Sequence, residues 1–71
     1  MKGRIKSFNP EKQYGFIVPL GYSEDHDVFF HMKDVFYIWG NVSFERGDPV
    51  EFNIINTPKG QHAINVIKGE G

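Results

Sequence analysis

With 71 residues, the chain can form one domain with a modest core but has no room for an elaborate catalytic pocket. It contains no cysteine, which excludes disulfides and thiolate metal sites, and no apolar run long enough for a signal segment or a membrane span. The formal charge of −1 argues against binding of nucleic acid mainly through phosphates. We expect a single domain over residues 1–71, located in the cytoplasm and not associated with a membrane.

Short segments with alternating apolar and polar residues recur along the chain, separated by turn residues. In chain order they predict strands at 2–8, 13–18, 27–32, 49–56 and 61–67. The predicted turns, rich in Asn, Pro and Gly, include 9–12, 19–21 and 57–60. Five short strands in so small a domain predict an all-β fold, a closed or nearly closed barrel that leaves no strand edge exposed.

Side-chain alternation assigns faces to most of these strands. The predicted inward positions are Ile5 in the first strand and Val50, Phe52 and Ile54 in the fourth. The opposite face of the first strand holds Arg4, Lys6 and Phe8. The last strand stays ambiguous, because its apolar residues fall on both faces: Ala63, Ile64, Val66 and Ile67.

Two aromatic-rich runs, 14–18 and 27–32, lie in neighbouring predicted strands. Alternation places Tyr14 with Phe16 on one face, and Phe29 with His31 on one face of the next strand. We favour the register that turns these rings outward, because the opposite register would expose Ile17. Exposed rings lose the free energy that burial in the core would contribute, whereas stacking of a nucleic-acid base on a ring contributes about 1–3 kcal/mol to binding. The pattern therefore predicts a face that binds single-stranded nucleic acid.

Residues 33–46 break the strand pattern. The apolar and aromatic run 35–39 is followed by a Gly40-Asn41 turn signal. This pattern is compatible with a short helical turn, a strand-like excursion or a flap along the platform. For Phe36 and Trp39 three interpretations stay open: a cap on the barrel, an additional stacking ring, or contact with another protein chain, including a homodimer through 35–39.

Nothing in the sequence indicates catalysis or a cofactor. His31 has the chemistry of a general base or metal ligand, but His26 lies in an acidic turn and His62 on a distant strand. We therefore expect no catalytic residue, no metal and no small-molecule cofactor, and we interpret His31 as a base-stacking ring.

Four segments, in order along the chain, together resemble the cold-shock domain family. They are Lys6-Ser7-Phe8-Asn9, the run K-Q-Y-G-F-I at 12–17, the run D-V-F-F-H at 27–31, and Lys59-Gly60 followed by Ala63 and Asn65-Val66. The resemblance implies a five-stranded OB-type barrel that binds single-stranded RNA and DNA without enzymatic activity. It also implies action as an RNA chaperone, an antiterminator or a modulator of translation.

The resemblance assigns binding roles to individual positions. The family's stacking residues correspond to Tyr14, Phe16, Phe29 and His31. Lys6 and Phe8 match its first-strand contacts, and Lys12 and Lys59 match basic positions beside the nucleic-acid backbone. A merely solvated turn lysine is the alternative for Lys12 and Lys59, and Trp39 is included as a candidate additional ring.

Several positions depart from the family pattern. Ser7 stands where the family usually has a stacking tryptophan, Gln13 replaces a glycine, Met32 an aromatic residue and Gln61 a proline. Most of these changes touch the binding face rather than the core. They motivate an alternative function, an OB-fold protein-interaction module with weakened nucleic-acid binding.

Overall fold

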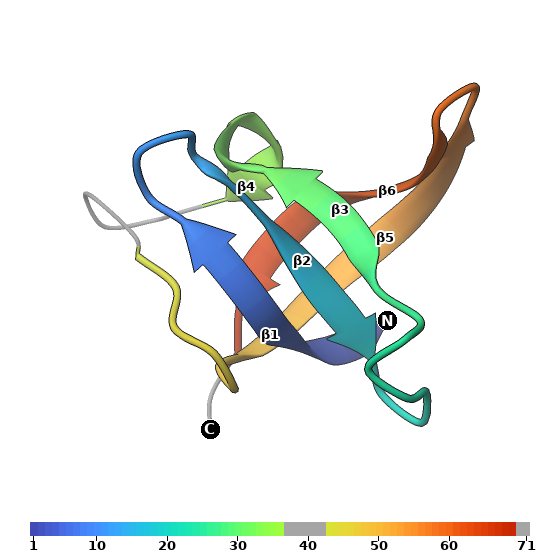
Figure 1. Cartoon of the computed structure of the whole chain (residues 1–71), viewed down its shortest axis with the longest axis horizontal. Helices are drawn as coiled ribbons and strands as arrows, with labels where there is room; N and C mark the ends of the chain where they lie inside the picture. Colours follow the sequence, from blue (N-terminus) through green and yellow to red (C-terminus); the bar gives the residue numbers. More distant parts are fainter. Residues whose placement is uncertain (37–42, 70–71) are drawn as a thin grey trace.

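The computed structural model describes residues 1–36 and 43–69, which form a barrel of β-strands around one hydrophobic core (Figure 1). The strands are β1 (Lys2–Asn9), β2 (Tyr14–Pro19), β3 (Val28–His31), β4 (Val35–Phe36), β5 (Pro49–Thr57) and β6 (Gly60–Lys68). A 3₁₀ turn at Met32–Asp34 is the one helical element in the described part of the chain. The predicted all-β barrel is confirmed.

Pairing between distant strands closes the barrel. The antiparallel pairs are β1–β2, β2–β3, β1–β5 and β5–β6. β3 then pairs in parallel with β6 at Phe29 and His62, and β4 pairs in parallel with β6 farther along. In Figure 1, β1, β2 and β3 form the near wall, and the long β5–β6 hairpin extends beyond the far wall.

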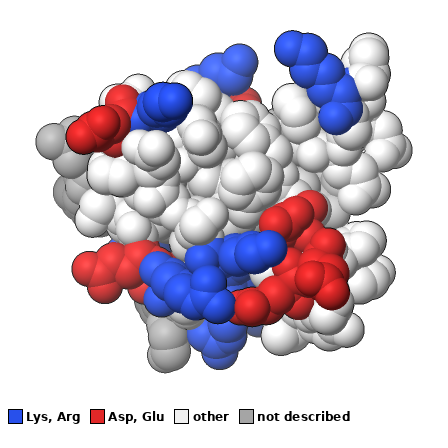
Figure 2. Space-filling view, in the orientation of Figure 1, with Lys and Arg blue, Asp and Glu red and all other residues white. Residues whose placement is uncertain are grey.

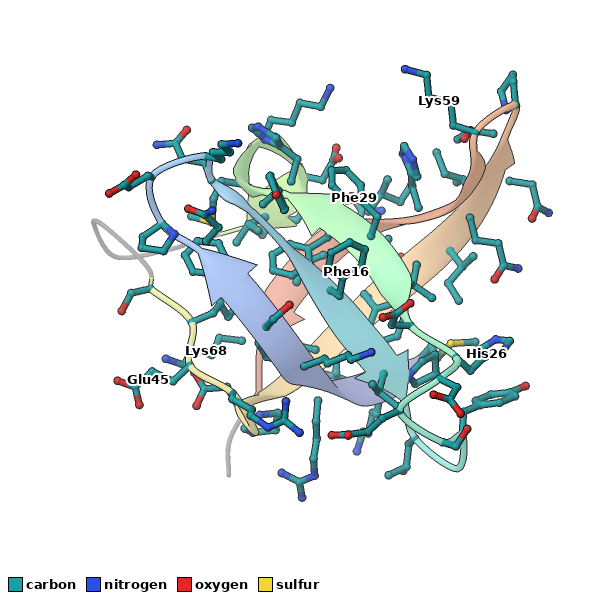
Figure 3. All side chains as sticks on the ribbon, in the orientation of Figure 1. Phe16, His26, Phe29, Glu45, Lys59 and Lys68 are labelled. Carbon is teal, nitrogen blue, oxygen red and sulfur yellow. The ribbon has the colours of Figure 1, made fainter. Side chains whose placement is uncertain are left out.

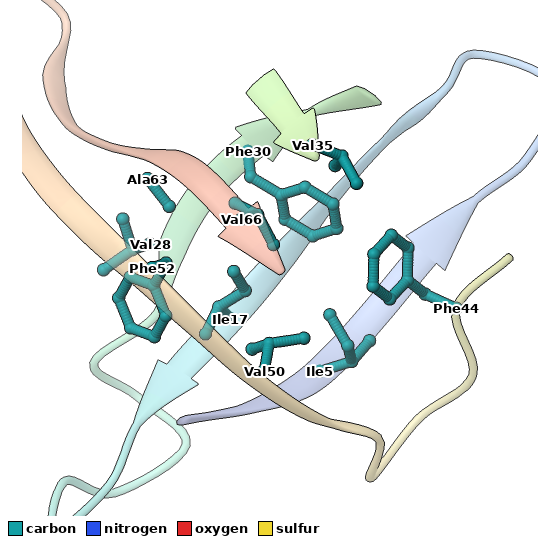
Figure 4. Close-up of a cluster of buried hydrophobic side chains, with 10 residues drawn as sticks. All are labelled: Ile5, Ile17, Val28, Phe30, Val35, Phe44, Val50, Phe52, Ala63 and Val66. Carbon is teal, nitrogen blue, oxygen red and sulfur yellow. The ribbon is translucent and has the colours of Figure 1, made fainter. Parts of the chain in front are cut away.

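Ten buried apolar side chains fill the barrel (Figure 4): Ile5, Ile17, Val28, Phe30, Val35, Phe44, Val50, Phe52, Ala63 and Val66. The predicted inward positions in the first and fourth strands are confirmed, with Ile54 packed at the edge of this core. Phe30 is fully buried, so its neighbour Phe29 points outward as expected.

A β-bulge in β1 changes the faces of the residues that follow it. Ile5 pairs with Ile17, and the next pair in the ladder joins Ser7 to Phe16. Lys6 is therefore the additional residue of the bulge. Beyond it, side chains fall on the face opposite to the one that strict alternation predicts.

The prediction that Phe8 shares the outer face with Lys6 is wrong for this reason. Phe8 pairs with Gly15 and packs against the core. Its ring stacks on Phe30 at 6.1 Å between centroids and meets Phe44 edge-on at 5.6 Å. Phe8 thus lies under the outer face rather than on it.

A second irregularity resolves the ambiguous face of the last strand. Asn65 has φ 52°, in the left-handed region that asparagine tolerates, and the register between β5 and β6 shifts beside it. Ala63 and Val66, three positions apart, are consequently both fully buried, while Ile67 is exposed.

Gln13 ends the first turn in a left-handed conformation, with φ 60°. This is why β2 begins one residue later than predicted, and a non-glycine residue there costs about 1 kcal/mol. The side-chain oxygen of Asn9 stabilises the turn by accepting from the backbone N–H groups of Glu11 and Lys12, at 3.0 and 3.1 Å. The predicted third strand ends at His31, because Met32 begins the 3₁₀ turn.

The segment 33–46 is described only in part. Its beginning contains both a helical turn and a short strand, and Phe44 near its end enters the core. Phe36 is 60% exposed, so the interpretation of this residue as a barrel cap is wrong. Trp39 lies outside the described residues, and the predictions that concern it stay predictions.

Candidate nucleic-acid interface

Four rings stand together on the outer face of β2 and β3, and we call them the aromatic platform: Tyr14, Phe16, Phe29 and His31. Tyr14 lies opposite His31 in the ladder, and Phe16 lies opposite Phe29. The Tyr14 ring centroid is 6.4 Å from that of Phe16 and 5.7 Å from that of Phe29, and the last two are 5.8 Å apart. Figure 3 labels Phe16 and Phe29 on this face.

The core beneath the platform explains why these rings face outward. Gly15 and Ile17 alternate with the β2 rings and are buried, as are Val28 and Phe30 in β3. All four platform residues are half-buried, because each packs against its neighbours but keeps one side in solvent. The register predicted from the sequence is confirmed, whereas the binding role of these residues stays a prediction.

His31 is held in a defined orientation at the end of β3. Its Nδ1 accepts a hydrogen bond from the backbone N–H of Lys33 at 3.1 Å. In the neutral imidazole an accepting Nδ1 places the proton on Nε2. The free edge of this ring therefore presents an N–H donor, which can reach a base carbonyl or a phosphate oxygen.

A fifth ring, His62, lies beside the platform. The expectation that His62 is on a distant strand is wrong, because the parallel β3–β6 pair places it opposite Phe29. The centroids of these two rings are 5.1 Å apart. No local sequence signal reports this contact, and only the assumption of a specific barrel closure could have predicted it.

Lys6 is part of a network of charges that we call the charge cluster: Lys6, Glu24, Asp27 and Arg46. The Nζ of Lys6 lies 2.9 Å from a carboxylate oxygen of Asp27 and also donates to the backbone carbonyl of Glu24. Arg46 pairs with the Glu24 carboxylate and donates to the carbonyl of Lys6 at 3.1 Å. A phosphate that contacts Lys6 must therefore compete with Asp27.

The other two predicted phosphate contacts are in turns. Lys12 follows β1 and Lys59 lies at the tip of the β5–β6 hairpin (Figure 3), and both are exposed. None of the three ion pairs among residues 1–36 and 43–69 includes either lysine. Figure 2 shows a large uncharged area on the near face, with basic and acidic side chains mixed along its lower edge.

The family model described as 'Cold-shock' DNA-binding domain matches residues 1–69. The chain belongs to the cold-shock domain family. It is 41% identical over 68 residues to the "Cold shock-like protein CspC" of Bacillus cereus, covering 96% of this chain and 98% of the relative. It is 39% identical over 67 residues to the "Cold shock protein CspA" of Staphylococcus aureus, with coverages of 94% and 96%.

A solved structure, "drosophila Unr CSD456", superposes on this cold-shock domain with a TM-score of 0.73. The match covers 97% of this chain but only 26% of the Unr chain, at 23% sequence identity. At this identity the likeness shows the shared fold alone.

Ser7 leaves one place on the outer face of this cold-shock domain without a ring. It is exposed and lies opposite Phe16 in the β1–β2 ladder, so it shares the outer face with the platform. The departure noted in the sequence therefore affects the surface next to Phe16, where the aromatic platform ends at a serine.

In the turn before β5, the carboxylate of Asp48 has a shifted pKa. Asp48 accepts a hydrogen bond from the backbone N–H of Glu45 at 2.8 Å, and its carboxylate lies 3.3 Å from Nζ of Lys68. The backbone hydrogen bond, with a smaller contribution from Lys68, lowers the pKa of Asp48 below its ordinary value of 3.8. Gly47 and Asp48 also hydrogen-bond the backbone of Ile5, so this carboxylate stabilises the turn that docks on β1.

In the described ranges, 1–36 and 43–69, no group of three or more acidic, histidine or cysteine side chains is placed to hold a metal ion. None of the helical structure described there has the length and hydropathy to cross a membrane.

Proposed function

We propose that this cold-shock domain binds single-stranded RNA and DNA with little dependence on sequence, by stacking bases on the aromatic platform. The observation that carries the proposal is the group of half-buried rings on β2 and β3, with centroids 5.7 to 6.4 Å apart, in a family described as DNA-binding. Every base has a π-face, and a stacked base contributes about 1–3 kcal/mol regardless of its identity.

In this proposal, different residues bind the bases and the phosphates of the nucleic acid. The three phenyl and phenol rings stack bases, and His31 adds a ring and its Nε2–H donor. Lys12 and Lys59 contact phosphates, and Lys6 does so after exchanging Asp27 for a phosphate. Trp39 is an additional stacking residue in this scheme, and Phe8 supports the platform from below through its contact with Phe30.

The proposed activity requires binding alone and no bond chemistry. A protein that binds the unpaired form of an RNA shifts the hairpin equilibrium toward open strands by mass action. This is the action of an RNA chaperone or an antiterminator. We propose that residues 1–71 act as one such domain in the cytoplasm, as the match to the cold-shock domain family supports.

A titration with short labelled strands tests the proposal. Fluorescence anisotropy is recorded with an oligothymidylate, an oligouridylate and a duplex of equal length. We expect saturable binding of both single strands, weaker binding of the duplex, and loss of affinity in Phe16→Ala. Tyr22→Ala is the matched control, because this ring is 57% exposed but lies in the loop after β2, away from the platform.

Two outcomes would refute base stacking on the platform. One is the absence of saturable binding at micromolar strand concentration. The other is equal affinity of Phe16→Ala, Tyr22→Ala and the unchanged protein.

Protein–protein contact is a second candidate function, favoured by one pair of residues. Phe36 and Ile67 are neighbours in the parallel β4–β6 pair and are 60% and 45% exposed. Adjacent exposed apolar side chains favour contact with another chain. The homodimer predicted through 35–39 would use Phe36, because Val35 is buried in the core. Sedimentation equilibrium over a range of protein concentrations tests it: self-association that Phe36→Ser abolishes would support this function, and a monomer at all concentrations would exclude the homodimer.

A further inference from the structure

The platform is continuous with a row of side chains that crosses the barrel closure. Phe16 lies opposite Phe29 in β2–β3, and Phe29 lies opposite His62 in the parallel β3–β6 pair. His62 in turn lies opposite Ile55 in the antiparallel β5–β6 hairpin. With strands about 4.8 Å apart, a row over four strands spans about 14 Å.

The outer half of this row faces solvent. The neighbouring pair, Ile54 and Ala63, points inward, with Ala63 fully buried and Ile54 packed against the core. Alternation therefore turns His62 and Ile55 outward. His62 is half-buried against Phe29, and Ile55 is 41% exposed.

Neither His62 nor Ile55 belongs to the buried core of the barrel. Ile55 is not part of the core and loses much of the free-energy gain of burial. The imidazole of His62 makes no hydrogen bond within residues 1–36 and 43–69, so both of its nitrogens are available to a ligand. Its ring is closer to Phe29 than any of the measured ring pairs of the platform are to each other.

We propose that His62 and Ile55 form an additional base-binding subsite, which continues the platform from Phe29 onto the β5–β6 hairpin. One base stacks on the imidazole and packs against the isoleucine side chain. Lys59 at the hairpin tip supplies a cation at this end of the path, and in the view of Figure 3 Phe29 lies between Phe16 and Lys59. This subsite rests on the proposed single-strand binding function.

The dependence of affinity on strand length tests the subsite. Dissociation constants are measured for oligothymidylates from about 4 to about 10 nucleotides, the range of small OB-fold site sizes. For the unchanged protein, affinity rises with length to a plateau. We expect His62→Ala to bind the shortest strands normally, to reach its plateau one nucleotide earlier, and to lose about tenfold in affinity for the longest strands, the scale of one stacked base.

Two further variants separate stacking from other effects. His62→Phe keeps a ring and is expected to restore the affinity for long strands. His26→Ala removes an exposed histidine from the loop between β2 and β3. We expect this variant to bind strands of every length with the affinity of the unchanged protein. Thermal unfolding of each variant verifies that the fold is intact.

The possible results are distinguishable. Equal affinity of His62→Ala and the unchanged protein at every length would refute the subsite while leaving the platform intact. A uniform loss at all lengths, or a loss in His62→Phe as large as in His62→Ala, would also refute it as a separate stacking subsite. If the unchanged protein binds no strand of any length, the proposed function itself fails, and the subsite fails with it.

Discussion

The ring of Phe30 lies so close to the backbone of Gly15 that a Cβ on Gly15 would be 2.9 Å from it. The same Cβ would lie closer still to the carbonyl oxygen of Ser7 across the β1–β2 ladder. Gly15 lies between Tyr14 and Phe16, so this close packing holds the part of β2 that carries both rings against the core.

Gly15→Ala is therefore expected to lower the free energy of unfolding by about 1–3 kcal/mol, the usual cost of overpacking. The carbonyl of Ser7 is backbone and cannot move without disturbing the ladder. Chemical denaturation measures the effect. Gly69→Ala is the control, because its new Cβ would meet nothing closer than 3.4 Å. Equal stability of the two variants would contradict the packing described here.

Truncation of a platform phenylalanine should mainly weaken binding, whereas truncation of a core phenylalanine should mainly lower the free energy of unfolding. Phe16→Ala or Phe29→Ala is expected to weaken single-strand binding by about 1–3 kcal/mol and to destabilise the fold less than a core truncation does. Phe30→Ala, at a site with 0% exposure, should cost about 3–5 kcal/mol of folding free energy. Binding titrations and denaturation together check this, and a core-sized loss in all three variants would be inconsistent with an outward platform.

The charge cluster makes a prediction about salt. Single-strand binding loses affinity with a log–log slope of about −0.7 per phosphate neutralised. Exchanging Asp27 for a phosphate at Lys6 replaces one ion pair by another, so this contact adds little to the slope. Lys12 and Lys59 make no ion pair with another described residue, and their two phosphate contacts give an expected slope of about −1.4. Asp27→Asn releases Lys6, so binding should tighten and the slope should steepen to about −2.

Asp25→Asn is the matched control for that experiment, because it removes an acid from the same loop that makes no ion pair with another described residue. An identical effect of the two variants would mean that overall charge, and not competition for Lys6, determines affinity. A slope several times steeper than expected would show that phosphate contacts dominate over stacking.

Asp48 should make stability depend on pH at the acid end. Its pKa is lowered in the fold, so its stabilising contribution is complete above the unfolded pKa of about 3.8 and is lost as the pH falls through the lower folded value. Asp48→Asn should therefore cost about 1 kcal/mol near neutral pH and progressively less below pH 3.8. Glu45→Gln keeps the backbone donor and is the control. A cost that persists undiminished in acid would exclude a carboxylate effect.

Trp39 is the sole tryptophan and gives a direct optical test of the segment that contains it. If Trp39 stacks on a base, oligonucleotide should quench its emission, and Trp39→Ala should weaken binding by about 1 kcal/mol or more. Titrations followed both by fluorescence and by calorimetry decide this. Constant emission during binding that calorimetry detects would exclude the stacking role of Trp39.

Side-chain orientations could be predicted from the sequence where buried and exposed residues alternate strictly, as in β2 and β3. The platform register follows from the buried partners of its rings, such as Ile17 and Phe30, and it could be predicted without any structure. Prediction failed at Phe8, because the inserted Lys6 reverses the faces after it. It also left the last strand open, because a single left-handed residue, Asn65, decides which side chains enter the core. Both irregularities depend on how two paired strands fit together. The alternation of inward and outward side chains within one strand carries no information about that pairing.

The parallel β3–β6 pair has a consequence for the order in which the strands of the barrel fold. β1, β2 and β3 are joined by short connections, so all four platform rings can come together while the chain is still incomplete. His62 arrives only when the last strand docks, a long-range contact whose loop-closure entropy makes it slow to form. A strand of nucleic acid bound to both Phe29 and His62 would link β3 to β6, the pair that forms last. Amide hydrogens of β3 and β6 should then exchange with solvent more slowly than in the free protein.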